Sequence, residues 1–145
     1  MKQEVQIRCK NNKKTEKVAI GSTLSDVFSQ FKLTLPYGPI CAKVNNKVEG
    51  MHYRVNHSKD VEFLNMQAPS ASRNYTRTLF FVLCKAVHDL YPKSYVIIDI
   101  PVSNGYYVNL QLGHPVMPTD VECIHQRIQE IIDAHLPIKR FEVPT

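Results

Sequence analysis

The sequence predicts an α+β chain of two small units, and three observations support this. Several short runs have an apolar residue at every second position, which is typical of half-buried strands. Three longer segments have apolar residues at helical spacing. Charge is uneven, since residues 1–66 hold 11 Lys and Arg against 6 Asp and Glu, whereas residues 67–145 hold 7 of each. We therefore expect domains at 1–66 and 75–145, joined by a small-residue linker at 67–74.

The first half is expected to contain two strands, one helix and three further strands. Residues 4–10 alternate between polar and apolar side chains, and an Asn-rich turn leads to a second strand that ends near Ile20. Thr23 is the candidate N-cap of a helix that Pro36 and Pro39 close. Its apolar face is formed by Leu24, Val27, Phe28 and Phe31. Strands over residues 40–44, 47–49 and 60–66 complete a roll with one helix across a mixed sheet.

The second half is expected to begin with a broad apolar helix from about Thr76 to Leu90. A strand over 95–100 and a partner over 106–112 flank Asn104-Gly105, a strong hairpin-turn signal. Thr119 and Glu122 have the spacing of a capping box, which predicts a helix that stops before Pro137. Residues 140–143 are compatible with a last strand, and the second unit is expected to be incomplete.

Composition excludes several classes of protein. The 145 residues are 43% hydrophobic and 21% charged, with a net charge of +5, which is ordinary for a soluble globular chain. No apolar run approaches the roughly 18 residues that a membrane span requires, so no membrane partner is expected. The cysteines are far apart in the sequence, so neither a disulfide framework nor a CxxC metal site is indicated. A cytoplasmic location with free thiols is expected.

The chain offers little for catalysis. It contains no GxxxxGK[ST], GxGxxG, GxSxG or HExxH motif. Cys84 and His88 have a spacing that suits two metal ligands, but Cys123 and His125 point in different directions on a helix and do not complete the site. We therefore predict no catalytic residue, no metal and no cofactor within these 145 residues.

A cluster of lysines surrounds the first expected hairpin turn: Lys10, Lys13, Lys14 and Lys17. It is compatible with a simple solvated loop. The functional alternative is contact with RNA or with an acidic partner, because clustered cations at an exposed tip gain from counterion release. No aromatic residue is interleaved with these lysines, which weakens single-strand RNA binding through stacking.

Residues 1–66 resemble a TGS domain, the ubiquitin-like β-grasp module of threonyl-tRNA synthetases and some nucleotide-handling enzymes. The resemblance depends on the opening hairpin, on Gly21-Ser22-Thr23-Leu24 and on Cys41-Ala42-Lys43-Val44-Asn45. Residues 75–143 resemble the start of the second additional domain of threonyl-tRNA synthetases. The matching segments are Ala86-Val87-His88-Asp89-Leu90-Tyr91-Pro92, Pro101-Val102-Ser103-Asn104-Gly105-Tyr106-Tyr107 and Pro118-Thr119-Asp120-Val121-Glu122.

The chain departs from this family at one motif. In the synthetases the first helix of the second domain carries an HxxxH motif of the editing site for mischarged tRNA, and the corresponding positions are Arg77 and Phe81. Phenylalanine cannot ligate a metal or move a proton, so editing is not expected here. Bacterial uridine kinases carry a similar front end before a P-loop domain and have no tRNA to edit.

Three hypotheses follow from these resemblances. The favoured one is the non-catalytic, ligand-binding or regulatory N-terminal region of a uridine kinase that phosphorylates uridine or cytidine, with ATP and Mg²⁺ implied for the parent enzyme. The alternative is the tRNA-contacting N-terminal region of a threonyl-tRNA synthetase with a degenerate editing site. The third is a stand-alone interaction module. A small ligand of the second domain would be sought near Arg77 and Tyr106-Tyr107, and its identity is not readable from the sequence.

Overall fold

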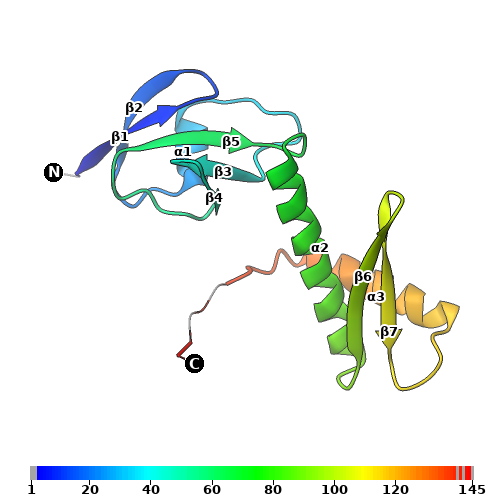
Figure 1. Ribbon diagram of the computed structural model, residues 1–145. Coiled ribbons are helices and arrows are strands. Elements are labelled where there is room, and N and C mark those ends of the chain that lie inside the picture. Colours follow the sequence, from blue (N-terminus) through cyan, green and yellow to red (C-terminus); the bar gives the residue numbers. More distant parts are fainter. Residues whose placement is uncertain (1–2, 140, 142, 145) are drawn as a thin grey trace. The chain divides into compact units, whose positions relative to one another are not determined.

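The computed structural model describes residues 3–139, 141, 143 and 144, and its fold is α+β, as expected (Figure 1). The chain divides into two compact units, Met1–Arg77 (unit 1) and Thr78–Thr145 (unit 2). The expected order of elements in the first half is confirmed. The elements are β1 (Glu4–Cys9), β2 (Lys14–Ala19), α1 (Leu24–Gln30), β3 (Cys41–Val44), β4 (Lys47–Gly50), β5 (Lys59–Leu64), α2 (Pro69–Leu90), β6 (Tyr95–Val102), β7 (Gly105–Gln111) and α3 (Pro118–Asp133).

Unit 1 contains a five-stranded sheet in the order β2-β1-β5-β3-β4. The first and last strands of the unit, β1 and β5, run parallel at its centre, and the other pairs are antiparallel. Helix α1 packs on one face, so this is the β-grasp arrangement with one helix across a mixed sheet (Figure 1). We call the opposite face the outer face of the sheet.

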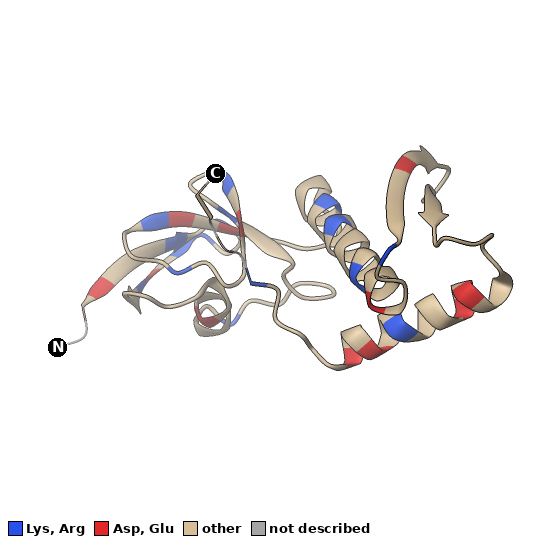
Figure 2. Ribbon diagram, turned by 90° about the horizontal axis from the view of Figure 1, so that it is seen from below, with Lys and Arg blue, Asp and Glu red and all other residues tan. Residues whose placement is uncertain are grey.

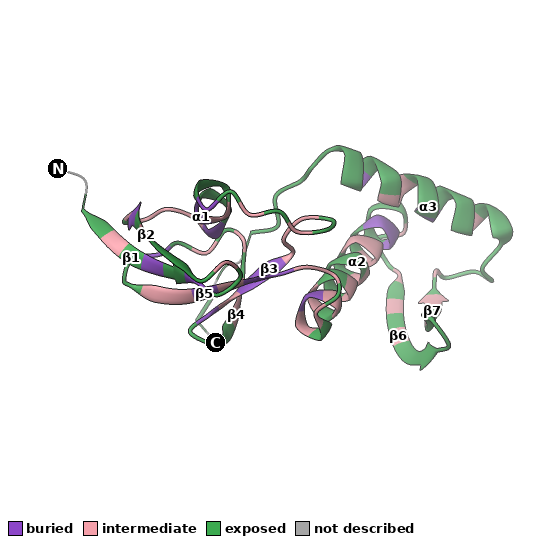
Figure 3. Cartoon of the chain, turned by 90° about the horizontal axis from the view of Figure 1, so that it is seen from above, coloured by how far each residue is buried: buried purple, intermediate pink, exposed green. Residues whose placement is uncertain are grey.

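The core of unit 1 lies between α1 and the sheet. Alternation along β1 points Ile7 and Cys9 inward, and Val61 and Phe63 of β5 lie on the same side. The predicted apolar face of α1 is confirmed, since Leu24, Val27 and Phe31 are buried and Phe28 is half-buried. Figure 3 shows buried positions on the strands of unit 1 and on α1. The helix ends before Phe31, well short of the prolines expected to close it.

The N-cap predicted at Thr23 is confirmed. Its Oγ1 accepts a hydrogen bond from the Asp26 N–H at 3.2 Å, and Asp26 Oδ2 accepts one from the Thr23 N–H at 2.9 Å. These reciprocal bonds form a capping box, which satisfies two backbone donors that the first turn of a helix leaves open.

The substitution Thr23→Ala is expected to lower the free energy of unfolding of unit 1 by about 1 kcal/mol, because it removes the cap. Urea unfolding of unit 1, followed by NMR, measures the change. Thr34→Ala is the matched control, since Thr34 lies in a loop and is exposed. Equal effects of the two substitutions would contradict the role assigned to the cap.

Helix α2 corrects two expectations about the second half. It begins at Pro69 rather than near Thr76, so most of the segment expected to be a linker, 67–74, is helical. Pro69 suits a first helical position, and the small side chain of Ala71 packs against Cys41 and Leu64 on the outer face. Thr76 lies inside the helix, where its Oγ1 donates to the Ser72 carbonyl at 3.0 Å. Small residues therefore indicate close helix packing here, not an irregular linker.

Unit 2 consists of the remainder of α2, the β6–β7 hairpin and α3. The hairpin turn is Ser103-Asn104, because Val102 pairs with Gly105, one residue earlier than the expected Asn104-Gly105 turn. Ser103 takes the positive φ of 53° that this turn requires. Few side chains are buried among the described residues of this unit (Figure 3): Ala86, Val87, Ile124 and Ile131.

Helix α3 begins earlier than predicted. Its N-cap is Met117 and its first residue is Pro118, so Thr119 lies inside the helix and is not the cap. Asp120 Oδ2 accepts the Met117 N–H at 2.8 Å, which supplies the carboxylate half of a capping box. The strand considered for residues 140–143 falls partly on residues 140 and 142, which lie outside the described residues. None of the described helices has the length and apolar character needed to cross a membrane.

Candidate nucleic-acid interface

The lysines of the first hairpin do not form one surface. Lys14 pairs with Cys9, whose side chain points toward α1, whereas Lys17 pairs with Gln6 on the outer face. Opposite residues of an antiparallel pair share a face, so Lys14 and Lys17 belong to opposite faces of the sheet. The hairpin therefore presents its positive charge in more than one direction.

The other two hairpin lysines lie near the tip. Lys13 is in the turn with a φ of 59°, and Lys10 Nζ donates to Asn46 Oδ1 at 3.3 Å. Figure 2 shows that the Lys and Arg positions of unit 1 are distributed over several strands and loops. The four lysines therefore lie at the same hairpin, but their side chains are not gathered on one face of the sheet.

Sequence reasoning missed one cation of this region, Arg8. It lies between the buried residues Ile7 and Cys9, so its exposed side chain is on the outer face. The register places it between Thr15 of β2 and Asp60 of β5. The alternation of residues 4–10 carried the signal, because it separates Arg8 from the core positions on either side of it.

The lysines of β2 also have a purely structural explanation. β2 is an edge strand with an unpaired side, and charged residues on such strands oppose pairing with other chains. Gln30 Nε2 of α1 donates to the Lys17 carbonyl at 2.8 Å and so satisfies part of the open edge. This explanation accounts for Lys14 and Lys17 but not for Arg8, which lies on an inner strand.

The two positions that correspond to the editing motif, Arg77 and Phe81, lie on α2. Both are exposed, and 57% of Phe81 is accessible. Phe81 lines a groove of about 550 Å³ in unit 2, together with Val82, Ile131, Ile132, Leu136 and Phe141. The ionisable residues that line this groove are Lys85, His135 and Lys139. The position that corresponds to the second histidine of the editing motif is thus occupied by an aromatic ring that lines a mainly apolar groove.

The metal ligands considered at the sequence level do not come together as a site. Cys84 is half-buried and His88 is exposed on α2, while Cys123 is exposed on α3. Across the described part of the chain, no group of three or more His, Cys, Asp or Glu side chains is placed to hold a metal ion. The four cysteines are unpaired, and burial raises the pKa of the Cys41 thiol.

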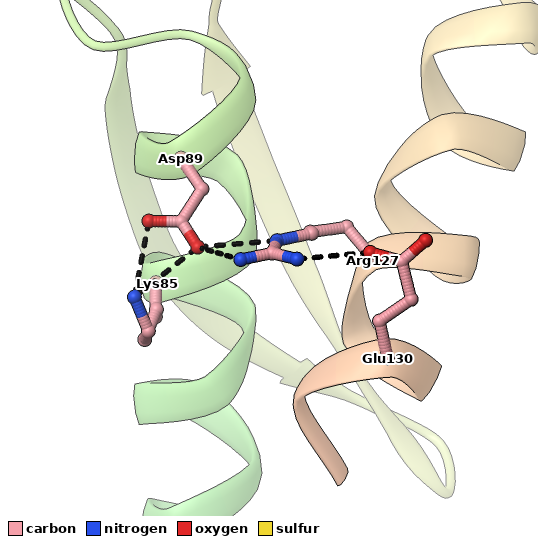
Figure 4. Close-up of polar contacts among 4 residues, drawn as sticks. All are labelled: Lys85, Asp89, Arg127 and Glu130. Atoms are coloured by element: carbon pink, nitrogen blue, oxygen red, sulfur yellow. Dashed lines mark hydrogen bonds and ion pairs between the residues drawn. The ribbon is translucent and has the colours of Figure 1, made fainter. Parts of the chain in front are cut away.

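An ion-pair network connects α2 and α3 within unit 2 (Figure 4). Asp89 Oδ2 accepts hydrogen bonds from Arg127 Nη2 at 2.8 Å and from Arg127 Nε at 3.2 Å. Lys85 Nζ lies 3.1 Å from Asp89 Oδ1, and Arg127 Nη1 donates to Glu130 Oε2 at 2.9 Å. The hydrogen bonds from Arg127, and then those from Lys85, hold the pKa of Asp89 below its ordinary value.

A second polar network fixes the start of α3. Besides the Met117 N–H, Asp120 accepts the Tyr91 hydroxyl at 2.7 Å, and His114 Nε2 lies 3.1 Å from its carboxylate. The Met117 and Tyr91 hydrogen bonds lower the pKa of Asp120. The hydrogen bond to Asp120 raises the pKa of Tyr91 to about 12. Both networks hold α3 against the C-terminal end of α2, so their role is structural.

Unit 2 is expected to lose stability in acid. Asp89 and Asp120 have folded-state pKa values below the ordinary 3.8, so they stabilise the fold above that pH. This contribution is lost as the pH falls through the lowered values. Urea unfolding of unit 2 at pH 7 and pH 3 should show a smaller loss of stability in Asp89→Asn than in the wild type. An equal loss in both proteins would contradict this role of Asp89. The exposed Asp99 of β6 provides the control Asp99→Asn.

Unit 1 is a β-grasp module whose outer face is polar over β2, β1 and the start of β5, and the comparisons with known proteins add the class of its relatives. No family model matches the chain. The chain is 26% identical to a threonine–tRNA ligase of Clostridioides difficile over 122 residues, which is 84% of this chain and 19% of that protein. It is 30% identical to the threonine–tRNA ligase of Natranaerobius thermophilus over 120 residues, which is 83% of this chain and 19% of that protein. The ligase of Clostridium kluyveri matches 97% of the chain at 26% identity.

These similarities extend through both units. They support a threonyl-tRNA-synthetase-like domain in this chain, and they favour the synthetase alternative over the uridine-kinase hypothesis. The chain spans about one fifth of the length of these relatives.

Proposed function

We propose that this chain is the tRNA-contacting region of a threonyl-tRNA-synthetase-like protein, with unit 1 as a TGS-type module. The observation that carries the proposal is the similarity to threonine–tRNA ligases over 83–97% of the chain. The β-grasp topology and the exposed cations of unit 1 support it, since phosphate contacts supply most of the affinity for a nucleic acid.

The proposal includes a degenerate editing site. Phe81 stands in an apolar groove, and neither it nor Arg77 acts as a general base near neutral pH. The chain therefore contributes binding and no hydrolysis. Purified chain should leave a mischarged tRNA intact, at the rate of the reaction without protein. Hydrolysis that depends on the chain would overturn this part of the proposal.

The competing functions are separated by the activity of the complete gene product. We expect it to attach threonine to tRNA in the presence of ATP and Mg²⁺. Phosphorylation of uridine without threonylation would restore the kinase hypothesis, for which a GxxxxGK[ST] motif should follow in the gene. If neither activity is found, the chain is an interaction module and the proposal fails.

The contribution of the hairpin lysines has its own test. A variant with Gln in place of Lys10, Lys13, Lys14 and Lys17 should bind tRNA with a salt slope reduced by up to about 4, since each lysine that neutralises a phosphate adds about one to the slope. Because two of these lysines lie on opposite faces, we expect less than the full reduction. Fluorescence anisotropy with labelled tRNA at several salt concentrations measures the slope. An unchanged slope would contradict phosphate contact by these lysines and would leave edge protection as the explanation for Lys14 and Lys17.

A further inference from the structure

A polar groove of about 350 Å³ lies on unit 1, where β1, β2 and β5 are neighbours. Three of its residues, Thr15, Arg8 and Asp60, form one row across the three strands on the outer face. Gln6 belongs to the next row, beside Lys17. The groove is thus built on three paired strands of the sheet, from the edge strand β2 to the central strand β5.

The wall of the groove is held in place by hydrogen bonds. The Asp60 N–H donates to Asn45 Oδ1 at 2.9 Å, and the Asn45 N–H donates to the Asp60 carbonyl at 2.9 Å. On the other side, Ser58 Oγ accepts the Gln6 N–H at 3.2 Å. These contacts fix the loop before β5 and the β3–β4 turn around Arg8.

The guanidinium of Arg8 has no protein partner within the described residues. Asp60 is its register neighbour on the same face, yet no ion pair or hydrogen bond joins the two side chains. A guanidinium offers five N–H donors in a planar fork, which suits two oxygens of one phosphate. Arg8 therefore presents an unpaired bidentate donor from a backbone position that the sheet register fixes.

The other lining groups fit the same ligand. Lys59, at the start of β5, also lines the groove, although the register pairs it with the inward-pointing Ile7. Thr15 and Ser58 add hydroxyl groups that are able to donate. Asp60 is the acidic residue of the lining, so the groove keeps a net positive charge, and Lys17 lies in the adjacent row. Apolar side chains are missing from the lining residues, which disfavours an aromatic or aliphatic ligand.

We propose that this groove binds a phosphate group, with Arg8 as its bidentate anchor. The phosphate belongs either to an RNA backbone or to a free nucleotide. The RNA source rests on the function proposed above, whereas the phosphate site itself does not. Arg8, on the inner strand β1, would then position RNA on the outer face, and the hairpin lysines would supply charge around it.

The first experiment uses inorganic phosphate with the complete 145-residue chain. Backbone amide signals of Gln6, Arg8 and Asp60 in NMR spectra should shift as phosphate is added. Arg8→Gln should weaken this binding by tenfold or more, and Arg8→Lys should also weaken it because the fork is removed. Lys47→Gln is the control, since Lys47 lies on β4 and pairs with Glu49 at 3.0 Å. No shifts in the wild type, or equal binding by Arg8→Gln, would overturn the proposal.

The second experiment separates the two sources of phosphate. With tRNA, Arg8→Gln should reduce the salt slope by about 1, and Lys47→Gln should leave it unchanged. If AMP and inorganic phosphate bind at the groove while tRNA does not bind the chain, the site stands with a free nucleotide as its ligand, and the proposed function fails. If tRNA binds wild type and Arg8→Gln with the same slope, RNA is excluded as the source. Unchanged urea midpoints confirm that both variants remain folded.

Discussion

Phe63→Ala is expected to destabilise unit 1 by about 3–5 kcal/mol, which is a large part of the stability of a small domain. Only 2% of Phe63 is accessible, and its ring meets that of Phe28 edge to face, with 5.1 Å between centroids. Truncation removes this ring pair and leaves a cavity between β5 and α1. Urea unfolding, followed through the NMR amide signals of β1 to β5, measures the decrease in stability.

The chain offers a matched control for this substitution. Phe81→Ala removes the same atoms from a side chain that is 57% accessible, so its effect should stay within about 0.5 kcal/mol. A small effect of Phe63→Ala, or a similar effect of both substitutions, would contradict the claim that Phe63 belongs to the core between α1 and the sheet.

Val87→Asp is the second substitution with a large expected effect, in unit 2. Val87 is fully buried, and few other side chains of this unit are. A carboxylate placed there has no partner, so we expect a loss of about 3 kcal/mol or more in the stability of unit 2. Val121→Asp is the control, since 54% of Val121 is accessible on α3, and it should change stability little. Loss of NMR dispersion for residues of α3 and the β6–β7 hairpin reports the unfolding.

The same variant tests where RNA is bound. The buried residues of unit 1 form clusters of their own, so its sheet should remain folded in Val87→Asp. If the outer face of unit 1 carries the RNA contacts, tRNA affinity should stay within about threefold of the wild type. Loss of tRNA binding, with the sheet signals intact, would instead assign the contacts to unit 2.

Local patterns were sufficient for most of the fold. The alternation around Ile7 and the apolar face of α1 predicted elements that the structure contains, because each pattern repeats with the period of its element. Boundaries were less predictable. The small residues around Ala71 were interpreted as a linker, although they pack a helix closely against Cys41 and Leu64, which are far away in sequence. Thr119 matched a capping motif, but Pro118 at the first helical position and Asp120 at the third moved the cap to Met117.

The candidate site was less accessible to sequence reasoning. Four lysines stood out because they are adjacent in the chain, whereas Arg8 did not. Alternation along β2 is enough to put Lys14 and Lys17 on opposite faces, but only the register of β2 with β1, and of β1 with β5, shows that Arg8 lies between Thr15 and Asp60. Strand order and register are tertiary properties, so proximity along the chain was a poor guide to a shared surface.

The departure at Arg77 and Phe81 first favoured a kinase parent, because such a protein has no tRNA to edit. The similarity to threonine–tRNA ligases favours the synthetase alternative instead. Loss of the editing histidines is compatible with both parents, since tRNA contact and hydrolysis depend on different residues. The two motif positions therefore bear on the chemistry of unit 2 and do not affect the RNA contact that we propose for unit 1.

The salt dependence of tRNA binding by the wild-type chain tests the central claim most directly. If the cations of unit 1 contact phosphates, the logarithm of the association constant should fall linearly with the logarithm of salt concentration, with a slope of roughly −2 to −4. A chain that does not bind tRNA at low salt, or one whose affinity is independent of salt, would contradict the claim that this surface is an RNA interface.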